Sequence, residues 1–287
     1  MILQKEIKDN AQQHEVPAFT IDKDWMLGHF IKAIYSFEDW KGKLIFKGGT
    51  CLRKCYIKDY RFSEDLDFTC TDAKFKVTEK SLAQLCKNIT AQSEAPVHLE
   101  SLRKLSFNDT LTGYEAKIKF WGADHPRNQE PPSPDRWTTS IKLEIILFEK
   151  MIFETEKKNI IHLYLDKKII NGSTAICYSI EEVISEKLRA LIQRAYTAPR
   201  DYFDIWFPVK HNNKLDWKEI RKAFIAKVKF KNLAFKSHKD LLTAEAEQLL
   251  NKHWENTMRH QLNPSMYVAA SVVIDFCKKL FKEKFEK

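Results

Sequence analysis

The chain has 287 residues, 44% of them hydrophobic, which is enough apolar material for a substantial core and two lobes and excludes a disordered chain. Lysine and arginine total 48 against 39 acidic residues, so the formal net charge is +9. This balance favours an anionic partner, of which nucleic acid is the commonest, over a merely soluble basic surface.

The N-terminus and the cysteines favour a cytoplasmic protein. The opening residues MILQKEIK are polar, and no apolar run could serve as a signal core or span a bilayer, so no membrane is expected. No CxxC pair is present, and the histidine spacing does not suggest zinc. We expect free thiols in a reducing cytoplasm. The six cysteines stand at positions 51, 55, 70, 86, 177 and 277.

Hydrophobic periodicity predicts that helices and strands alternate in the first part of the chain. The expected helices are an amphipathic one over about 23–38, one beginning near Thr50 or Cys51, and one over 79–92. The expected strands cover 44–47, 65–70, 98–107, 113–121 and 138–148. Residues 122–134 contain four prolines and form a loop, either a plain hairpin connection or a lid.

From about residue 180 the pattern becomes helical. Ser179 followed by Glu182 predicts a capping box that opens a helix to about Ala195, and Pro199 suits the first turn of the next helix. We therefore predict two domains, 1–180 and 181–287. Further helices are expected over about 215–229, 239–259 and 265–285.

Two carboxylates fall on one face of an expected strand. Asp65 and Asp67 are two residues apart in SEDLD, so both point to one side while Leu66 and Phe68 face the core. A divalent cation would relieve their repulsion, and magnesium suits hard oxygen ligands shared with phosphates. Glu144, on the polar face of another strand, could complete a two-metal or metal-plus-base site. Taken alone, these acids could also be solvated residues at a sheet edge.

A glycine turn precedes the acidic strand. Gly48 and Gly49 follow a buried strand, so their backbone can approach a ligand closely and their N–H groups can bind phosphate. Thr50 adds a hydroxyl beside them. The turn matches neither a GxGxxG nor a Walker A sequence, which argues against Rossmann and P-loop sites. Together with SEDLD it predicts a site for phosphate and metal.

A lysine points inward on the first helix of the second lobe. Lys187 lies inside the apolar stripe, and Arg194 continues its line along the helix. An inward lysine needs an anion, either a protein acid or a ligand phosphate, unless it reaches solvent at the edge of the stripe. Asp201 and Asp204 lie on neighbouring positions of the next helix. Pairing with Arg200 and the helix dipole explain one of these acids but not obviously both.

Two segments closely resemble AbiEii/AbiGii-type nucleotidyltransferase toxins, which are MenT-like members of the DNA polymerase β-like nucleotidyltransferase superfamily. They are KGGTCLRKCYIKDYRFSEDLDFT, from Lys47 to Thr69, and YSIEEVISEKLRALIQRAYTAPRDYFDIW, from Tyr178 to Trp206. The resemblance spans about residues 20–210. It implies an α+β fold, in which a polymerase β-like nucleotidyltransferase core, a mixed sheet with flanking helices, is joined to a helical C-terminal lobe. The core with its N-terminal helices would then be 1–180.

The resemblance also implies roles for individual residues. Asp65 and Asp67 would be ligands of Mg²⁺, with Glu144 as the third acid of the metal site. Lys187 would contact the triphosphate, and either Asp201 or Asp204 would be the downstream essential acid. The predicted catalytic residues are Asp65, Asp67, Glu144, Lys187, Asp201 and Asp204. The predicted nucleotide-binding residues are Lys47, Gly48, Gly49, Thr50, Ser63, Lys187 and Arg194.

The implied activity is that of a bacterial toxin in a toxin–antitoxin or phage-defence pair. Studied relatives add nucleotides to the 3′ acceptor end of tRNA, so the expected partners are an NTP, the tRNA acceptor stem and a cognate antitoxin. Transfer to a protein or small-molecule hydroxyl, as a nucleotidyl or phosphoryl group, is an alternative, and so is a degenerate fold that only binds. The lysines from Lys227 to Lys239 could contact the RNA backbone or form a solvated face.

Overall fold

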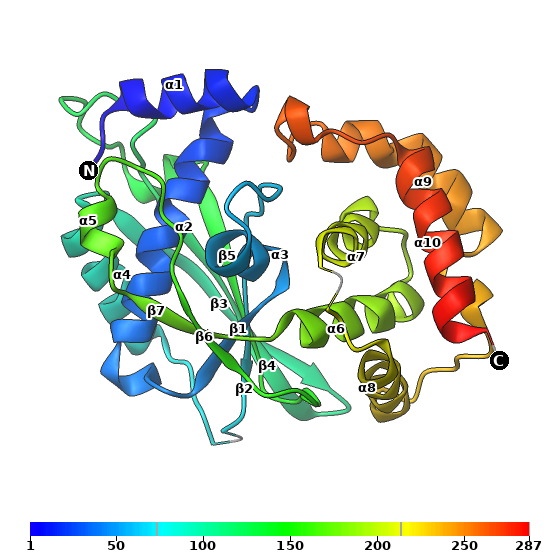
Figure 1. Ribbon diagram of the computed structural model, residues 1–287. Coiled ribbons are helices and arrows are strands. Elements are labelled where there is room, and N and C mark those ends of the chain that lie inside the picture. Colours follow the sequence, from blue (N-terminus) through cyan, green and yellow to red (C-terminus); the bar gives the residue numbers. More distant parts are fainter. Residues whose placement is uncertain (73, 213, 287) are drawn as a thin grey trace. The chain divides into compact units, whose positions relative to one another are not determined.

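The computed structural model describes residues 1–72, 74–212 and 214–286. The chain divides into two compact units, both visible in Figure 1. Unit 1 comprises Met1–Glu149 and Thr155–Cys177, and unit 2 comprises Lys150–Glu154 and Tyr178–Lys287. Within the described ranges, none of the helices combines the length and the apolar character that a membrane-spanning segment needs.

Unit 1 is built on a seven-stranded mixed sheet with the order β3-β4-β5-β2-β1-β7-β6. At its centre, β1 pairs antiparallel with β2 and parallel with β7, while β2 pairs parallel with β5. The pairs β3–β4, β4–β5 and β6–β7 are antiparallel. The strands are β1 Leu44–Lys47, β2 Leu66–Cys70, β3 Val97–Phe107, β4 Thr110–Phe120, β5 Ser140–Ile146, β6 Glu156–Asn159 and β7 Thr174–Cys177. The predicted mixed sheet of an α+β fold is confirmed.

Helices flank this sheet (Figure 1), and most residues of the long helix α2 are buried. The prediction that it is amphipathic is wrong, because its side chains are buried all round; among them are Trp25, Met26, Leu27, Phe30 and Ile31. It also starts earlier than expected. The flanking helices are α1 Gln4–His14, α2 Ala18–Ser36, α4 Glu79–Ser93 and the short α5 Lys167–Ile170.

The polar residues of α2 can be buried because other parts of unit 1 satisfy them. Asp24 accepts from Arg53 Nε at 2.5 Å, from Lys54 Nζ at 3.0 Å and from the Tyr164 hydroxyl at 2.9 Å. Burial alone would raise the pKa of Asp24, but the two cations hold it well below its usual range. This cluster joins α2 to the π-helical turn Leu52–Tyr56, which follows the glycine turn.

The proline-rich connection between β4 and β5 is a loop, as predicted, and both of its ends are anchored. The Ala123 N–H donates to the buried Asp22 carboxylate at 2.7 Å. Gly122 leaves room for that carboxylate, since a Cβ there would lie 2.1 Å from Asp22 Oδ2. At the other end, the Trp137 indole donates to the Pro132 carbonyl at 2.8 Å. These contacts hold the two ends of the loop, while residues 126–131 between them are exposed.

Unit 2 is helical, which confirms the predicted helical C-terminal region. Pro199 lies in the first turn of its helix, as expected. The two long helices predicted near the C-terminus are each broken at their start, where Thr243 caps a new helix and Pro264 opens a separate 3₁₀ turn. The helices are α6 Ile180–Gln193, α7 Pro199–His211, α8 Trp217–Phe230, α9 Ala244–Met258 and α10 Ala270–Phe285.

Ser179 caps α6, but the predicted capping box does not form. The Ser179 hydroxyl accepts the Glu182 N–H at 3.1 Å. The Glu182 carboxylate instead accepts the N–H groups of Ile152 and Phe153, at 2.9 and 2.7 Å, and pairs with Lys227. The Glu182 carboxylate and the Lys227 ammonium are both fully buried, so each needs the other's charge. Their pairing therefore takes precedence over a hydrogen bond from the Ser179 N–H to Glu182. These bonds tie the segment around Ile152 to unit 2.

Candidate functional site

Three predicted acids meet on one face of the central sheet of unit 1. Asp67 on β2 is in register with Lys47 on β1 and with Glu144 on β5. Asp65 comes one residue before β2, and its spacing of two from Asp67 places it on the same face. Leu66 between them is buried on the opposite face, as predicted. The three acids are half-buried, and Lys47 is buried beside them.

Lys142, which was not among the predicted site residues, lies between these acids. Its Nζ is 3.8 Å from Asp65 Oδ2 and 3.8 Å from Glu144 Oε2. Burial alone would lower the pKa of Lys142, but Asp65, Glu144 and Asp67 together raise it. Burial and Asp67 raise the pKa of Glu144, although Lys142 and Lys47 act in the opposite direction. The three acids therefore still favour binding of a further cation when the charges of Lys47 and Lys142 are counted.

The two glycines of the turn are required by side chains of the protein itself. Gly48 has a φ of +80°, and a Cβ there would lie 2.6 Å from Asp67 Oδ2. At Gly49 a Cβ would lie 2.4 Å from Nη2 of Arg61, a buried residue that was also not predicted. The helix α3 (Gly48–Cys51) starts two residues earlier than expected and continues into the π-helical turn.

Thr50 and Ser63 have different surroundings, although both were predicted to bind nucleotide. Thr50 is fully buried, and its hydroxyl donates to the carbonyl oxygen of Asp65 at 2.5 Å. The Ser63 hydroxyl lies 2.9 Å from that of Thr50 and belongs to a half-buried residue. Thr50 thus fixes the start of the acidic strand, while Ser63 is the hydroxyl closer to solvent.

In unit 2, Lys187 lies between both acids of the RDYFD segment. Its Nζ is 2.7 Å from Asp201 Oδ1 and 2.8 Å from Asp204 Oδ2. Arg194 Nε adds a contact of 3.1 Å with Asp201 Oδ2. Both carboxylates are fully buried. The anions that the buried Lys187 requires are therefore carboxylates of α7. The positive charges of Lys187 and Arg194 balance the negative charges of Asp201 and Asp204.

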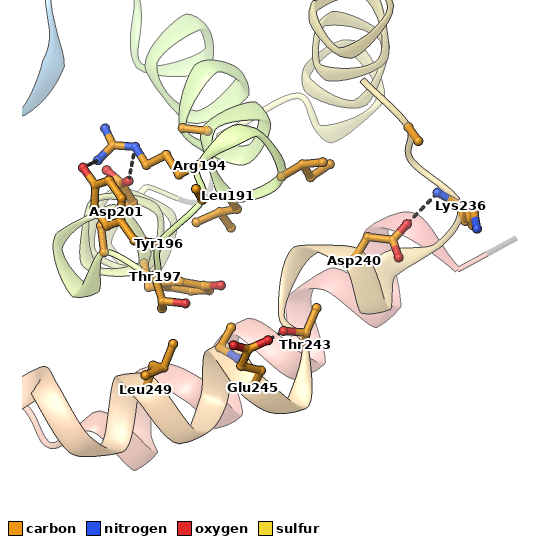
Figure 2. Close-up of a pocket in the computed structure, with 17 residues that line it drawn as sticks. Leu191, Arg194, Tyr196, Thr197, Asp201, Lys236, Asp240, Thr243, Glu245 and Leu249 are labelled. Atoms are coloured by element: carbon orange, nitrogen blue, oxygen red, sulfur yellow. Dashed lines mark hydrogen bonds and ion pairs between the residues drawn. The ribbon is translucent and has the colours of Figure 1, made fainter. Parts of the chain in front are cut away.

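A pocket of about 430 Å³ opens beside this network. Figure 2 shows Arg194 joined to Asp201 on one side of the pocket and the first turns of α9 on the other. The lining is mixed, with apolar side chains such as Leu191 and Leu249 and hydroxyls from Thr197 and Thr243. Arg194, which was predicted to bind nucleotide, thus borders a cavity large enough for a small ligand.

The lysines between 227 and 239 do not form one surface. Lys227 is fully buried, donates to the Lys150 carbonyl at 2.6 Å and pairs with Glu182, so the prediction that it contacts RNA is wrong. The basic face of α8 lies elsewhere and borders a shallow groove that also reaches α10. We call it the α8 basic face, and it consists of Lys218, Arg221, Lys222 and Lys229, with Trp217 and Ile225 between them; the ion pair of Glu283 and Lys284 on α10 also lines the groove.

The mixed sheet, the glycine turn after β1 and the acids on β2 and β5 have the arrangement expected of a nucleotidyltransferase. The chain belongs to the AbiEii nucleotidyl transferase toxin family of type IV toxin–antitoxin systems, whose family model matches residues 29–285. It is therefore a nucleotidyltransferase of a toxin–antitoxin system, and this membership implies an NTP substrate and an antitoxin partner.

A solved structure shares this fold. MenT4, a nucleotidyltransferase toxin from Mycobacterium tuberculosis H37Rv, superposes with a TM-score of 0.65 at 18% identity, over 99% of this chain and 90% of that one. An antigenic nucleotidyltransferase-like protein from Paracoccidioides brasiliensis matches with a TM-score of 0.29 at 14% identity, over 66% of this chain and 80% of that one. No curated protein gives a significant match.

Proposed function

We propose that this toxin transfers a nucleoside monophosphate from an NTP to an RNA 3′-hydroxyl, at the acceptor end of tRNA, and thereby blocks translation. The group of Asp65, Asp67 and Glu144 around Lys142 is the observation that carries the transfer site. The RNA acceptor is supported by the resemblance to the MenT-like toxins, by the net charge of +9 and by the α8 basic face.

The acids fit a magnesium ion. Carboxylate oxygens are the ligands that Mg²⁺ prefers, and Asp65, Asp67 and Glu144 would hold it where Lys142 now contributes its charge. The raised pKa of Glu144 is compatible with this assignment, because burial and then the Asp67 charge disfavour a bare carboxylate at that point. When bound, the ion would neutralise the triphosphate and the charge that develops during transfer.

The remaining chemistry falls to positioned groups of the chain. The 3′-hydroxyl oxygen forms a bond to the α-phosphorus, the bond from that phosphorus to the bridging oxygen breaks, and pyrophosphate leaves. The hydroxyl proton needs a base, and Glu144 suits this role because its pKa is raised. Asp204 is the weaker candidate, since its carboxylate is fully buried against Lys187.

Other groups would hold the triphosphate. The N–H groups of Gly48 and Gly49 lie at the end of β1, with Ser63 and Arg61 beside them. The family resemblance assigns Lys187 a contact with the triphosphate, and its side chain in unit 2 is 13% exposed beside its two carboxylates.

The proposal is tested by incubating the purified chain with Mg²⁺, tRNA and each NTP labelled on the α- or the γ-phosphate. We expect α-label on the RNA 3′ end. Asp65→Asn and Asp67→Asn should slow its appearance by about 10²-fold or more, since charge stabilisation is lost. Glu115→Gln is the matched control, because Glu115 is in register with Glu144 but pairs with Arg103.

Each other outcome points to a different activity. Label on protein or on a small molecule alone would rule out the RNA acceptor, and transfer of γ-label would identify a kinase. Absence of any transfer by a folded chain would leave only binding. Mass spectrometry of tRNA 3′ ends after expression would identify the nucleotide and the tRNA.

A further inference from the structure

Three of the six cysteines meet in the interior of unit 1. Cys51 ends α3, Cys55 lies on the π-helical turn that follows, and Cys177 ends β7. Their sulfur atoms all lie within 4.8 Å of one another. All three residues are buried, Cys51 and Cys177 completely. Neither the RNA 3′-end chemistry nor the fold of the sheet requires three thiols at this point.

The local backbone explains how these thiols converge. Cys51 and Cys55 are four residues apart, so both project from one face of the helical segment. The segment changes to π-helical geometry after Cys51, a rare feature that recurs at functional sites. Cys177 joins them because the parallel pairing of β7 with β1 sets it opposite Phe46. The third thiol therefore comes from a distant part of the sequence.

We propose that Cys51, Cys55 and Cys177 form a three-thiolate binding site for a soft d¹⁰ metal ion. A metal–sulfur bond of about 2.3 Å sets three sulfur atoms about 4 Å apart in a trigonal arrangement. The cluster reaches that spacing with small side-chain shifts. Thiolate ligands favour Cu(I) and Zn(II) over harder ions.

The number of ligands separates these two ions. In the described part of the chain, no histidine, acid or further cysteine joins the three thiols. Cu(I) is satisfied by three thiolates, whereas Zn(II) in proteins is almost always four-coordinate and would need an additional small ligand. We therefore expect Cu(I) to bind more tightly than Zn(II).

The surroundings can support negatively charged sulfur. Hydrogen bonds from Cys177 and Cys51 lower the pKa of the Cys55 thiol to about 5, and Lys54 and Lys158 act in the same direction. Burial and the contacts within the cluster raise the pKa of the Cys51 and Cys177 thiols, so an ion that binds must displace their protons.

The site lies directly behind the glycine turn. Cys51 follows Thr50, whose hydroxyl fixes the backbone of Asp65. A bound ion would tie this turn to β7 without touching the acids. It would also stabilise the folded chain by mass action, so the unfolding temperature should rise with ion concentration.

The test is a competition titration of the reduced, metal-free chain with Cu(I), and separately with Zn(II), against a chromophoric chelator of each ion. We expect one ion per chain and a higher unfolding temperature after loading. Cys51→Ala, Cys55→Ala and Cys177→Ala should each weaken binding by at least about tenfold, because a direct ligand matters more than an outer one. Cys86→Ala removes a buried thiol of α4 outside the cluster and should bind like the wild type.

X-ray absorption spectroscopy of the loaded wild-type chain counts sulfur neighbours and does not depend on whether the variants fold. Three sulfur neighbours, alone with Cu(I) or with one lighter atom for Zn(II), support the site. Fewer than three, no uptake of either ion, or equal loss of binding in Cys86→Ala overturns it and leaves ordinary buried thiols. Because metal binding is measured without NTP or RNA, this result is independent of the transfer activity.

Discussion

Glu144 illustrates how neighbouring residues set the behaviour of one carboxylate. Burial and Asp67 raise its pKa, so the protonated form persists above the ordinary range of a glutamate, while a magnesium ligand must be ionised. We expect the Mg²⁺ affinity of the wild type to rise as the pH increases through this raised pKa. Glu144→Gln should bind Mg²⁺ more weakly and lose that pH dependence, measured by titration calorimetry from about pH 5 to pH 8.

Glu115→Gln is the control for Glu144→Gln, because Glu115 lies opposite Glu144 on the neighbouring strand β4. Glu115 pairs with Arg103 at 2.8 Å and contributes only a minor part of the shift at Glu144. This variant should keep both the Mg²⁺ affinity and its dependence on pH. If Glu144→Gln behaved in the same way, Glu144 would be neither a metal ligand nor the base.

The parts of the site that could be predicted from sequence are those within one short segment. The turn at Gly48 and the spacing of Asp65 and Asp67 are local features of the sequence. The period-two alternation of a strand was enough to predict that both aspartates lie on one face. Lys142 was overlooked although it shares a strand face with Glu144, because its nearness to Asp65 follows from the parallel pairing of β2 with β5. Sequence periodicity carries no information about which strands become neighbours.

Helix α2 offers a test at the scale of a secondary-structure element. Burial raises the pKa of Asp22 from 3.8 to about 7. Between these values the folded chain keeps a proton that the unfolded chain has lost, so this stabilising contribution is full below about pH 4 and is lost as the pH rises through 7. Asp22→Asn removes the titration. The variant should therefore gain stability relative to wild type between pH 5 and pH 8, by on the order of 3 kcal/mol.

The measurement is urea-induced unfolding of both chains at the two pH values. Asp39→Asn is the control, since Asp39 is exposed and should leave the pH trend of the wild type unchanged. Parallel pH trends for Asp22→Asn and the wild type would show that the anchor of the β4–β5 loop does not titrate in this range.

The pair α6 and α7 raises the question whether Lys187 serves the fold or a ligand. Lys187→Met would leave Asp201 and Asp204 buried with less positive charge, and should lower the free energy of unfolding by about 3–5 kcal/mol. Adding Asp204→Asn removes one of those charges and should restore part of the loss, so the two changes are not additive. Lys210→Met, an exposed lysine on α7, should change stability by less than about 0.5 kcal/mol.

A urea-unfolding cycle of the two single variants and the double variant measures this coupling. If Lys187→Met were as stable as the wild type while NTP binding fell, the lysine would act on the ligand alone. The sequence could not decide this point, because Lys187 and the acids of α7 are brought together only by packing of the two helices.

Most elements with a long apolar pattern were predicted, whereas the short strand β7 was missed although its buried residues alternate. Strand β1 was found at its observed limits because a buried apolar run ends at the glycines. Strand β6, Glu156–Asn159, consists of polar residues at a sheet edge and gave no signal. Helix α1 was also overlooked, since it buries little more than Ile7 and Ala11.

For the whole molecule, the net charge of +9 matters less than where the charge lies. Lys227 counts toward the total charge, but it is fully buried in unit 2, where Glu182 neutralises it. The α8 basic face gathers residues three, four, seven and eleven positions after Lys218, which is the periodicity of one helix face. Trp217 and Ile225 lie among these cations, so the surface combines positive charge with one aromatic ring on which a base could stack.

The double variant Arg221→Ala/Lys229→Ala should weaken tRNA binding and flatten its dependence on salt, by about 0.7–0.9 in the logarithmic slope for each phosphate that is no longer neutralised. Fluorescence anisotropy over a series of salt concentrations measures both effects. Lys167→Ala/Lys168→Ala removes the same charge from the exposed surface of α5 and should change neither. Equal effects of the two double variants would mean that only overall charge attracts the RNA. An effect confined to α8 would place a phosphate-binding surface there, because the two proteins would carry the same net charge.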